Sequence, residues 1–251
     1  MFQKERQDAI LEILKNQGYV TVKYLTQKLH YSTATVNRDL NELERQKKIK
    51  RSYGGAELTE QKAIPLPYRY DKMRNEKRMI GHVAAEFVES GDTVFIDGTT
   101  TTQSMARYLT EIKDITVITN NMALVSFLSE YNISAICLGG FVQDAPSMLN
   151  GEQTVMNARM YHADKMFFSS GSILLDGRIG ASGYALLLDT MVKNSDKVFF
   201  LVDHDKIDVP VKKYLFDLEF VDYVISDYDF PMQTKTKFPK TQFIYAGKNG
   251  K

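Results

Sequence analysis

The feature that most constrains the fold is a regular alternation of apolar, strand-like segments with helix-like segments, beginning near residue 93. The predicted strands are Thr93–Asp97, Ile115–Thr119, Ile133–Leu138, Lys165–Ser169, Lys197–Asp203, Tyr223–Ser226 and Gln242–Tyr245. The predicted intervening helices are Thr102–Leu109, Met122–Ser129, Glu152–Tyr161 and Tyr184–Val192. Short apolar strands that alternate with amphipathic helices predict an α/β domain with a largely parallel sheet.

Polar or glycine-containing loops follow several of these strands. They are Asp97-Gly98-Thr99-Thr100-Thr101, Thr119-Asn120, Gly139-Gly140 and the turn from Asp203 to Lys206. Ligands of such sheets bind beyond the carboxyl ends of the strands. Glycine lets the backbone approach a ligand, hydroxyls donate hydrogen bonds, and a helix N-terminus or a lysine favours a phosphate. Each loop alone is equally well a plain turn, but their convergence on one sheet edge predicts a site for a small phosphorylated ligand.

The first part of the chain has a different pattern, in which short helices are accompanied by a β-prone stretch, Tyr19-Val20-Thr21-Val22. A first apolar face contains Ile10 and Leu14, and this helix ends near Gln17-Gly18. Thr21 can cap a second helix, and Ser32 can cap a third whose apolar stripe is Val36, Leu40 and Leu43. Helix, short turn and helix is the helix-turn-helix arrangement, whose second helix enters the major groove of DNA.

The face of the third helix opposite its apolar stripe is hydroxylic, amide-bearing and cationic. Such side chains hydrogen-bond base edges and phosphates, although an ordinary surface helix would also be polar here. The residues predicted to contact DNA from this region are Thr21, Ser32, Thr33, Thr35, Asn37, Arg38, Asn41 and Arg45.

A run of basic residues follows this helix and ends in Gly54-Gly55. A basic run is usually a solvated surface, but one that follows a helix-turn-helix and ends in a hairpin signal indicates a β-hairpin wing that meets phosphates. The further residues predicted to contact DNA are therefore Lys47, Lys48, Lys50, Arg51 and Tyr53.

Pro65 and Pro67 interrupt a polar stretch, and a helical pattern resumes at Asn75. The sequence thus predicts a DNA-binding domain over residues 1–58, a linker over 59–74 and an effector-sensing α/β domain over 75–251.

These motifs resemble the DeoR family of bacterial sugar-operon regulators from about residue 5 to residue 230. The resemblance rests on Ser32-x-x-Thr35-Val36-x-Arg38-Asp39-Leu40, Ile49-x-Arg51-x-x-Gly54-Gly55-Ala56, the Asp97 loop, Thr119-Asn120, Gly139-Gly140, Ala163-Asp164-Lys165 and Asp203-x-x-Lys206. It implies a winged helix-turn-helix domain that binds a double-stranded operator, and a sensor domain similar in fold to sugar-phosphate isomerases. It also implies repression released by a phosphorylated sugar, and a homodimer or homotetramer that reads a symmetric operator.

The chain departs from the family pattern at several positions. Asn37 replaces an arginine, which changes one predicted DNA contact. The turn beginning at Ser170 differs from the usual Ala-Asp-Gly type, and Tyr184 and Leu188 stand where a glutamate and a lysine are usual. We include Ser170 with the loop residues in the predicted effector site. The altered positions leave open a regulator that answers to another ligand and, less favoured, an isomerase-like enzyme with Asp97 or Asp203 as its base.

Composition bears on how DNA is bound, on metal and cofactor binding, and on the compartment of the protein. The net charge is only +1, so DNA binding must depend on local clusters of basic residues. His30, His82, His162 and His204 lack metal-ligand spacing, and neither a metal nor a cofactor is predicted. The single cysteine, Cys137, is expected in a buried strand. The polar N-terminus and the lack of a run of ~20 apolar residues predict a cytoplasmic protein with no membrane partner.

Overall fold

The computed structural model describes residues 3–17, 19–46, 48–52, 54–58, 71–142, 147–181, 184–211 and 213–247. The chain divides into two compact units, Met1–Met73 and Arg74–Lys251. Most of the linker predicted at 59–74 lies outside the described residues, so its bounds stay a prediction.

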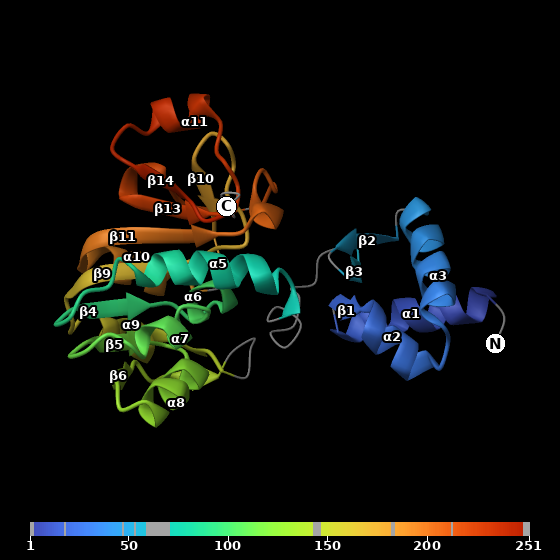
Figure 1. Cartoon of the computed structure of the whole chain (residues 1–251), viewed down its shortest axis with the longest axis horizontal. Helices are drawn as coiled ribbons and strands as arrows, with labels where there is room; N and C mark the ends of the chain where they lie inside the picture. Colours follow the sequence, from blue (N-terminus) through green and yellow to red (C-terminus); the bar gives the residue numbers. More distant parts are fainter. Residues whose placement is uncertain are drawn as a thin grey trace. The chain divides into compact units, whose positions relative to one another are not determined.

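The smaller unit is a winged helix-turn-helix domain, as predicted (Figure 1). Its elements are α1 (Gln3–Gln17), β1 (Tyr19–Thr21), α2 (Val22–Leu29), α3 (Thr33–Arg45), β2 (Ile49–Ser52) and β3 (Gly55–Leu58). The strands form one antiparallel sheet in the order β1-β3-β2. The turn between β2 and β3 places Gly54 at a φ of 69°, a conformation that glycine adopts without steric cost.

The capping residues predicted from the sequence precede α2 and α3. The Thr21 hydroxyl accepts a hydrogen bond from the Tyr24 N–H at 3.1 Å, and the Ser32 hydroxyl accepts one from the Thr35 N–H at 3.3 Å. The turn between α2 and α3 contains His30 in the left-handed region, with a φ of 57°. The apolar stripe of α3 is fully buried among residues of α1 and α2, which fixes the opposite face outward.

The larger unit contains the predicted parallel sheet, with seven strands in the order β14-β13-β11-β9-β4-β5-β6. All neighbouring strands in it are parallel. The strands are β4 (Thr93–Ile96), β5 (Thr116–Thr119), β6 (Ser134–Cys137), β9 (Ala163–Phe168), β11 (Ser195–Val202), β13 (Tyr223–Ser226) and β14 (Gln242–Tyr245).

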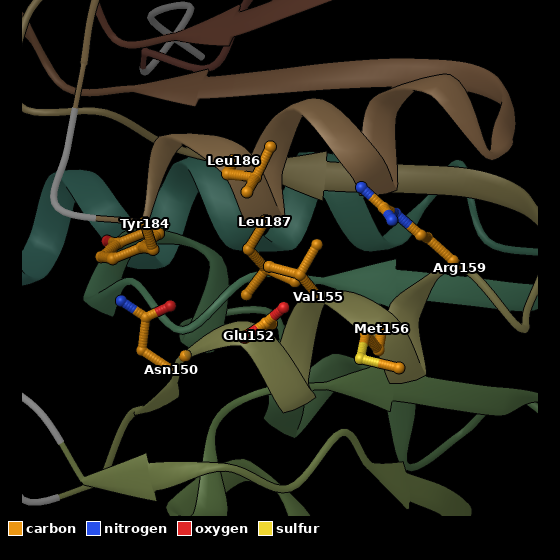
Figure 2. A pocket seen from close by; sticks show the side chains of 9 residues that line it. Asn150, Glu152, Val155, Met156, Arg159, Tyr184, Leu186 and Leu187 are labelled. Atoms are coloured by element: carbon orange, nitrogen blue, oxygen red, sulfur yellow. The ribbon is translucent and has the colours of Figure 1, made fainter.

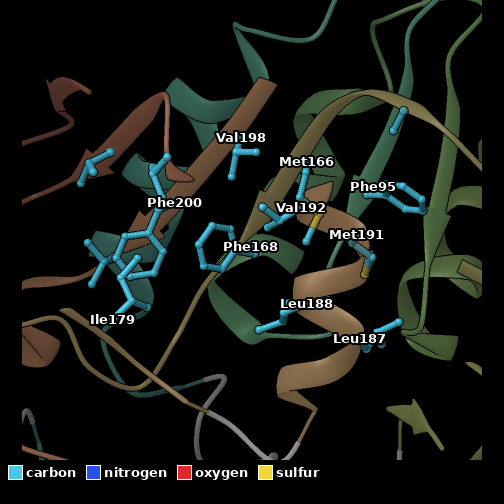
Figure 3. Packing of buried hydrophobic residues seen from close by; sticks show 14 of the residues in the cluster. Phe95, Met166, Phe168, Ile179, Leu187, Leu188, Met191, Val192, Val198 and Phe200 are labelled. Carbon is cyan, nitrogen blue, oxygen red and sulfur yellow. The ribbon is translucent and has the colours of Figure 1, made fainter. Parts of the chain in front are cut away.

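Helices cover both faces of this sheet. Successive residues of its central strands point to opposite faces, and since these residues are apolar, both faces must be buried. Phe167 and Phe199 pack with residues of α5 (Arg74–Ala85), α7 (Ala106–Leu109) and α8 (Met122–Glu130). Phe168 and Phe200 pack on the other face with residues of α9 (Glu152–Ala158) and α10 (Ala185–Lys193), as Figure 3 shows for α10. The unit is therefore a three-layer α/β domain.

Several short elements were not predicted. They are α11 (Met232–Lys237), the paired strands β7 (Phe141–Val142) and β8 (Leu149–Asn150), the paired strands β10 (Arg178–Gly180) and β12 (Tyr214–Asp217), and the 3-10 turns η1 (His204–Lys206) and η2 (Leu218–Phe220).

Two expectations from the sequence are wrong in detail. The helix predicted at Thr102–Leu109 is interrupted, since α6 (Thr100–Gln103) ends before α7 begins. The Ser104 hydroxyl donates at this break to the Thr101 carbonyl oxygen, which a continuous helix would pair internally, and to the carbonyl oxygen of Lys77 in α5. Cys137 is exposed, because its strand β6 is the edge strand of the sheet.

Candidate functional site

The face of α3 that was predicted to meet DNA is accessible. The exposed residues among those predicted are Ser32, Thr33, Arg38, Asn41, Arg45, Lys48 and Lys50, and the half-buried ones are Thr21, Thr35, Asn37 and Arg51. Lys47 and Tyr53 lie outside the described residues. Arg45 is bound on the surface by Glu42, with N–O distances of 3.1 and 2.9 Å, so it must exchange partners to reach a phosphate.

Arg51 in the wing forms hydrogen bonds to two asparagines of α3. Its Nη2 donates to Asn37 Oδ1 at 2.6 Å, and its Nη1 donates to Asn41 Oδ1. The Arg51 backbone N–H also donates to the Glu44 carboxylate at 2.9 Å. The three predicted DNA-contacting residues are thus one preassembled cluster that joins the wing to α3.

Asp39 has a structural role that sequence reasoning missed. It is fully buried on α3, and its carboxylate accepts hydrogen bonds from Nη2 of Arg6 at 3.0 Å and from Nε of Arg6. The Arg6 guanidinium also lies over the Tyr31 ring, 4.8 Å from its centroid. The sequence did contain a signal for this role, since Asp39 adjoins the apolar stripe of α3. A carboxylate buried there requires a partner of opposite charge.

In the larger unit, Asp97 organises the loop after β4. Its Oδ1 accepts from the Thr99 N–H at 3.1 Å, the Thr99 hydroxyl at 2.8 Å and the Thr102 hydroxyl at 2.6 Å. Its Oδ2 accepts from the Ser169 N–H at 3.2 Å. Burial raises the pKa of Asp97 to about 6, and the hydrogen bonds from Thr102, Thr99 and Ser169 only partly offset this. The carboxylate is therefore a positioning group between β4 and β9.

Lys206 brings together residues from three strand ends. Its Nζ lies 2.9 Å from the Thr101 hydroxyl, 3.2 Å from the Ser169 hydroxyl and 3.0 Å from Asp203 Oδ2. The Lys206 side chain is one-fifth exposed, whereas Asp203 is buried. Ser169, which the sequence analysis did not assign, is a member of this cluster. A cation and two hydroxyls at the carboxyl edge of a parallel sheet are suited to bind an anionic ligand, which here would compete with the Asp203 carboxylate for Lys206.

Asn120, at the end of β5, lies beside Gly98. Its side-chain amide donates to the Leu149 carbonyl at 2.8 Å, which fixes its orientation. Its Oδ1 is buried without a hydrogen-bond partner among the described residues, and it lies 3.1 Å from where a Cβ on Gly98 would be. A buried acceptor without a donor is costly, so this oxygen is a candidate partner for a ligand hydroxyl.

Other residues of the predicted effector site have visible structural uses. The Thr119 hydroxyl accepts from the Asn121 N–H at 3.1 Å, and the Ser170 hydroxyl donates to the Gly180 carbonyl. A Cβ on Gly140 would lie 2.1 Å from the Thr154 hydroxyl, so glycine is required there for close packing against α9. The Thr154 hydroxyl donates to the Gly139 carbonyl at 2.8 Å.

His204 has an internal partner, the carboxylate of Asp227, to which its Nδ1 is hydrogen-bonded. Desolvation lowers the pKa of His204, but this hydrogen bond and the charges of Asp227, Asp205 and Asp203 raise the pKa overall. Within the described ranges, His, Cys, Asp and Glu side chains form no group that could hold a metal ion.

A pocket of about 450 Å³ lies between α9 and α10. Its lining includes Asn150, Glu152, Val155, Met156, Arg159, Tyr184, Leu186 and Leu187 (Figure 2). Tyr184 thus lines this pocket, whereas Leu188 is buried in the core below it. The position where the family usually has a lysine is therefore a packing position in this chain.

Comparisons with known proteins agree with both units. The family model described as a DeoR-like helix-turn-helix domain matches residues 6–62, and that of the DeoR C terminal sensor domain matches residues 72–228. The "HTH-type transcriptional repressor GlcR" of Bacillus subtilis is 32% identical over 90% of this chain and 89% of its own. The "Glycerol-3-phosphate regulon repressor" of Escherichia coli is 29% identical over 90% of this chain and 92% of its own.

Solved structures resemble part of this chain. Ribose 5-phosphate isomerase A from Methanocaldococcus jannaschii has a TM-score of 0.41 at 14% identity, over 54% of this chain and 55% of the isomerase. The eIF2B delta chain from Chaetomium thermophilum has a TM-score of 0.46 at 18% identity, over 65% of this chain and 60% of its own. The match to the isomerase therefore spans about half of its length.

The relatives are named as transcriptional regulators and repressors, which identifies a regulator and not an enzyme. In the part of the chain that the structure describes, every helix is too short or too polar to span a bilayer. The two matching family models, which together extend from residue 6 to residue 228, show that this chain is a DNA-binding transcriptional regulator of the DeoR family.

Proposed function

We propose that the chain represses an operon of carbohydrate metabolism and is released from its operator by a phosphorylated sugar bound at the carboxyl edge of β4, β5, β9 and β11. The observation that carries the proposal is the convergence of Lys206 with the Thr101 and Ser169 hydroxyls. In this proposal these groups bind the phosphate, because ammonium and hydroxyl donors match its oxygens.

The sugar part of the ligand would extend toward Asn120 and Gly98. The Asn120 Oδ1 would accept a hydrogen bond from a sugar hydroxyl. The Met148 side chain, 2.8 Å from where a Cβ on Gly98 would be, would have to move aside for that approach. Asp97 supports the site indirectly through its hydrogen bonds to Thr99, Thr102 and Ser169.

Release from DNA requires that the ligand bind one geometry of the regulator more tightly than the other. A coupling of about 1–3 kcal/mol is typical of such switches. Operators read by helix-turn-helix proteins usually contain two half-sites, so the proposal includes a dimer as the smallest functional form.

The test is a DNA-binding titration with a fragment from upstream of the protein's own gene. It uses two salt concentrations and a panel of hexose, pentose and glycerol phosphates. Glycerol 3-phosphate is included because a relative is named as the repressor of its regulon. We expect tight, salt-sensitive binding that one phosphate weakens about 5- to 150-fold, the range of typical couplings.

Lys206→Met should abolish the response to that phosphate while DNA binding in its absence stays unchanged. Lys235→Met is the matched control, because Lys235 is also paired with one carboxylate, Asp229, at 2.7 Å but lies in α11. A response that survives in Lys206→Met contradicts the proposed phosphate site. Tight binding unaffected by every phosphate would favour a regulator that answers to another ligand.

A further inference from the structure

Exposed large apolar residues collect around α9 and α10. They form a surface that we call the α9–α10 face, which comprises Phe141, Val142, Met156, Met160 and Leu186, with exposed fractions of 52% to 76%. Met156 and Leu186 line the pocket between the two helices (Figure 2). Exposed apolar patches of this kind mark interaction surfaces.

The hairpin of β7 and β8 continues this surface beyond the helices. A Cβ on Gly151 would lie 2.4 Å from the Phe141 ring, so this ring covers the residue that precedes α9. Gly151 and Asn150 are both part of the pocket lining. Phe141 and the pocket therefore belong to one continuous surface.

Two opposite charges lie at the two ends of α9 on the same face, Glu152 as its first residue and Arg159 as the helical residue that caps its C-terminus. Glu152 and Arg159 are exposed, both line the pocket, and Met156 lies between them in the sequence. Seven residues of α-helix correspond to about two turns, or ~10 Å, so the two charges are on one side of α9. Within the described part of the chain, neither side chain forms an ion pair.

This charge arrangement is complementary to itself. When two copies of α9 meet antiparallel across a two-fold axis near Met156, Glu152 of each copy faces Arg159 of the second copy. A two-fold interface pairs the same patch on both subunits, so each contact occurs twice. The apolar residues between the charges would then be covered, as in other homodimer interfaces.

The same elements are hydrogen-bonded to the predicted effector site. The Leu149 N–H in β8 donates to the Asn120 carbonyl, and the Asn120 amide donates to the Leu149 carbonyl, both at 2.8 Å. Asn157 in α9 donates to the Leu138 carbonyl at 2.7 Å. A surface on α9 is thus attached to the ends of β5 and β6.

We propose that the α9–α10 face is a two-fold interface between two copies of this chain, held by apolar contacts and by paired Glu152–Arg159 contacts. This inference deepens the proposed function, which requires a dimer, by assigning the surface that forms it.

The test is sedimentation of the full chain without sugar phosphates. Glu152→Arg and Arg159→Glu each place like charges opposite one another twice per dimer. Each should weaken self-association at least about tenfold, equivalent to ~1.4 kcal/mol. The double variant, with both charges exchanged, should associate within about threefold of the unmodified chain, since opposite charges again face one another.

Glu111→Arg and Lys113→Glu are matched controls, because they make the same charge changes at exposed positions outside this face. Leu186→Lys is an independent variant that should also yield monomers. The interface is wrong if the single charge reversals associate like the controls, if the double variant is as weak as the single ones, or if the unmodified chain sediments as a monomer. Because no sugar phosphate is present, these results do not depend on whether the effector proposal holds.

Discussion

At the scale of single residues, Arg51 orients the side chains of Asn37 and Asn41, two residues that we predict to contact DNA. Both asparagine carbonyl oxygens accept a hydrogen bond from the Arg51 guanidinium, which uses one of the two lone pairs of each oxygen and favours the NH₂ groups for contacts with bases. An asparagine that reads adenine uses both its oxygen and its nitrogen. While Arg51 holds them, these side chains suit acceptors such as guanine O6 and N7 or thymine O4.

Arg51→Met should therefore shift base preference toward adenine at the positions that these asparagines contact. Selection of binding sites from random DNA by the unmodified chain and by the variant measures this shift. Lys50→Met is the control, because it removes a neighbouring wing charge and should lower affinity without changing base preference. Identical preferences for the unmodified chain and Arg51→Met would contradict the assigned role of Arg51.

The second prediction at this scale concerns the ionisation of Asp97. Its pKa is raised from 3.8 to about 6 in the folded state, mainly by burial. Between these two pH values the folded state holds the proton more tightly than the unfolded chain. The contribution of Asp97 to stability therefore rises as the pH falls from about 6 to about 4.

Asp97→Asn cannot titrate, so the stability of the unmodified chain relative to this variant should rise over that pH range. The expected change is up to about 3 kcal/mol, at 1.36 kcal/mol for each pKa unit. Urea unfolding at several pH values measures it, and the exposed Glu111→Gln serves as the control. A difference between the unmodified chain and Asp97→Asn that is constant with pH would show that burial does not raise this pKa.

The sequence located the residues of the candidate sensor site better than it assigned their roles. Asp97, Thr101, Asp203 and Lys206 follow apolar strands, and the parallel sheet brings them to one edge. The Asp97 carboxylate accepts hydrogen bonds from Thr99, Thr102 and Ser169. These contacts depend on the geometry of the loop, which residue type alone does not specify. Ser169 was missed because its only signal was its place at the end of a strand.

At the scale of elements, α3 is attached to α1 by the Arg6–Asp39 pair as well as by apolar packing. Asp39 is fully buried and the Arg6 side chain is 12% exposed. Asp39→Ala would leave the guanidinium without its carboxylate, which typically costs about 3–5 kcal/mol. We expect this loss as faster amide hydrogen exchange in α1 and α3.

A double variant distinguishes the loss of the pair from the burial of an unpaired charge. Arg6→Met with Asp39→Leu should be less destabilising than Asp39→Ala alone, because neither charge remains buried. Glu42→Ala, which removes the partner of Arg45 on the surface of α3, is the control and should leave amide exchange close to that of the unmodified chain. An Asp39→Ala variant that exchanges like this control would contradict the anchoring role.

The main elements were predictable because their signals are local. Apolar runs predicted the seven strands of the large sheet, and the capping residues Thr21 and Ser32 predicted where α2 and α3 begin. The pairs β7–β8 and β10–β12 were not predictable, because β7, β8 and β10 have only two or three residues, too few to show a pattern, and β12 is defined by its pairing with β10. The break between α6 and α7 likewise depends on Ser104 bonding to Lys77, far away in the sequence.

At the scale of the whole molecule, the proposed interface on the larger unit has a consequence for DNA binding by the smaller unit. One winged helix reads one half-site, so tight binding to a symmetric operator requires two copies. If the α9–α10 face joins these copies, charge reversals on this face of the larger unit should weaken operator binding. The effect should appear on a full operator but not on a single half-site.

Mixing two defective variants tests this coupling directly. Glu152→Arg alone and Arg159→Glu alone place like charges across the interface, so each should bind a full operator weakly. In a mixed dimer the two arginines of one copy face the two glutamates of the other, and both contacts are restored. An equimolar mixture should therefore bind the operator at least about tenfold more tightly than either variant, a gain of ~1.4 kcal/mol. Titrating the operator with each variant and with the mixture measures this gain. A mixture that binds no better than its components would mean that these charges do not face one another in the DNA-bound dimer.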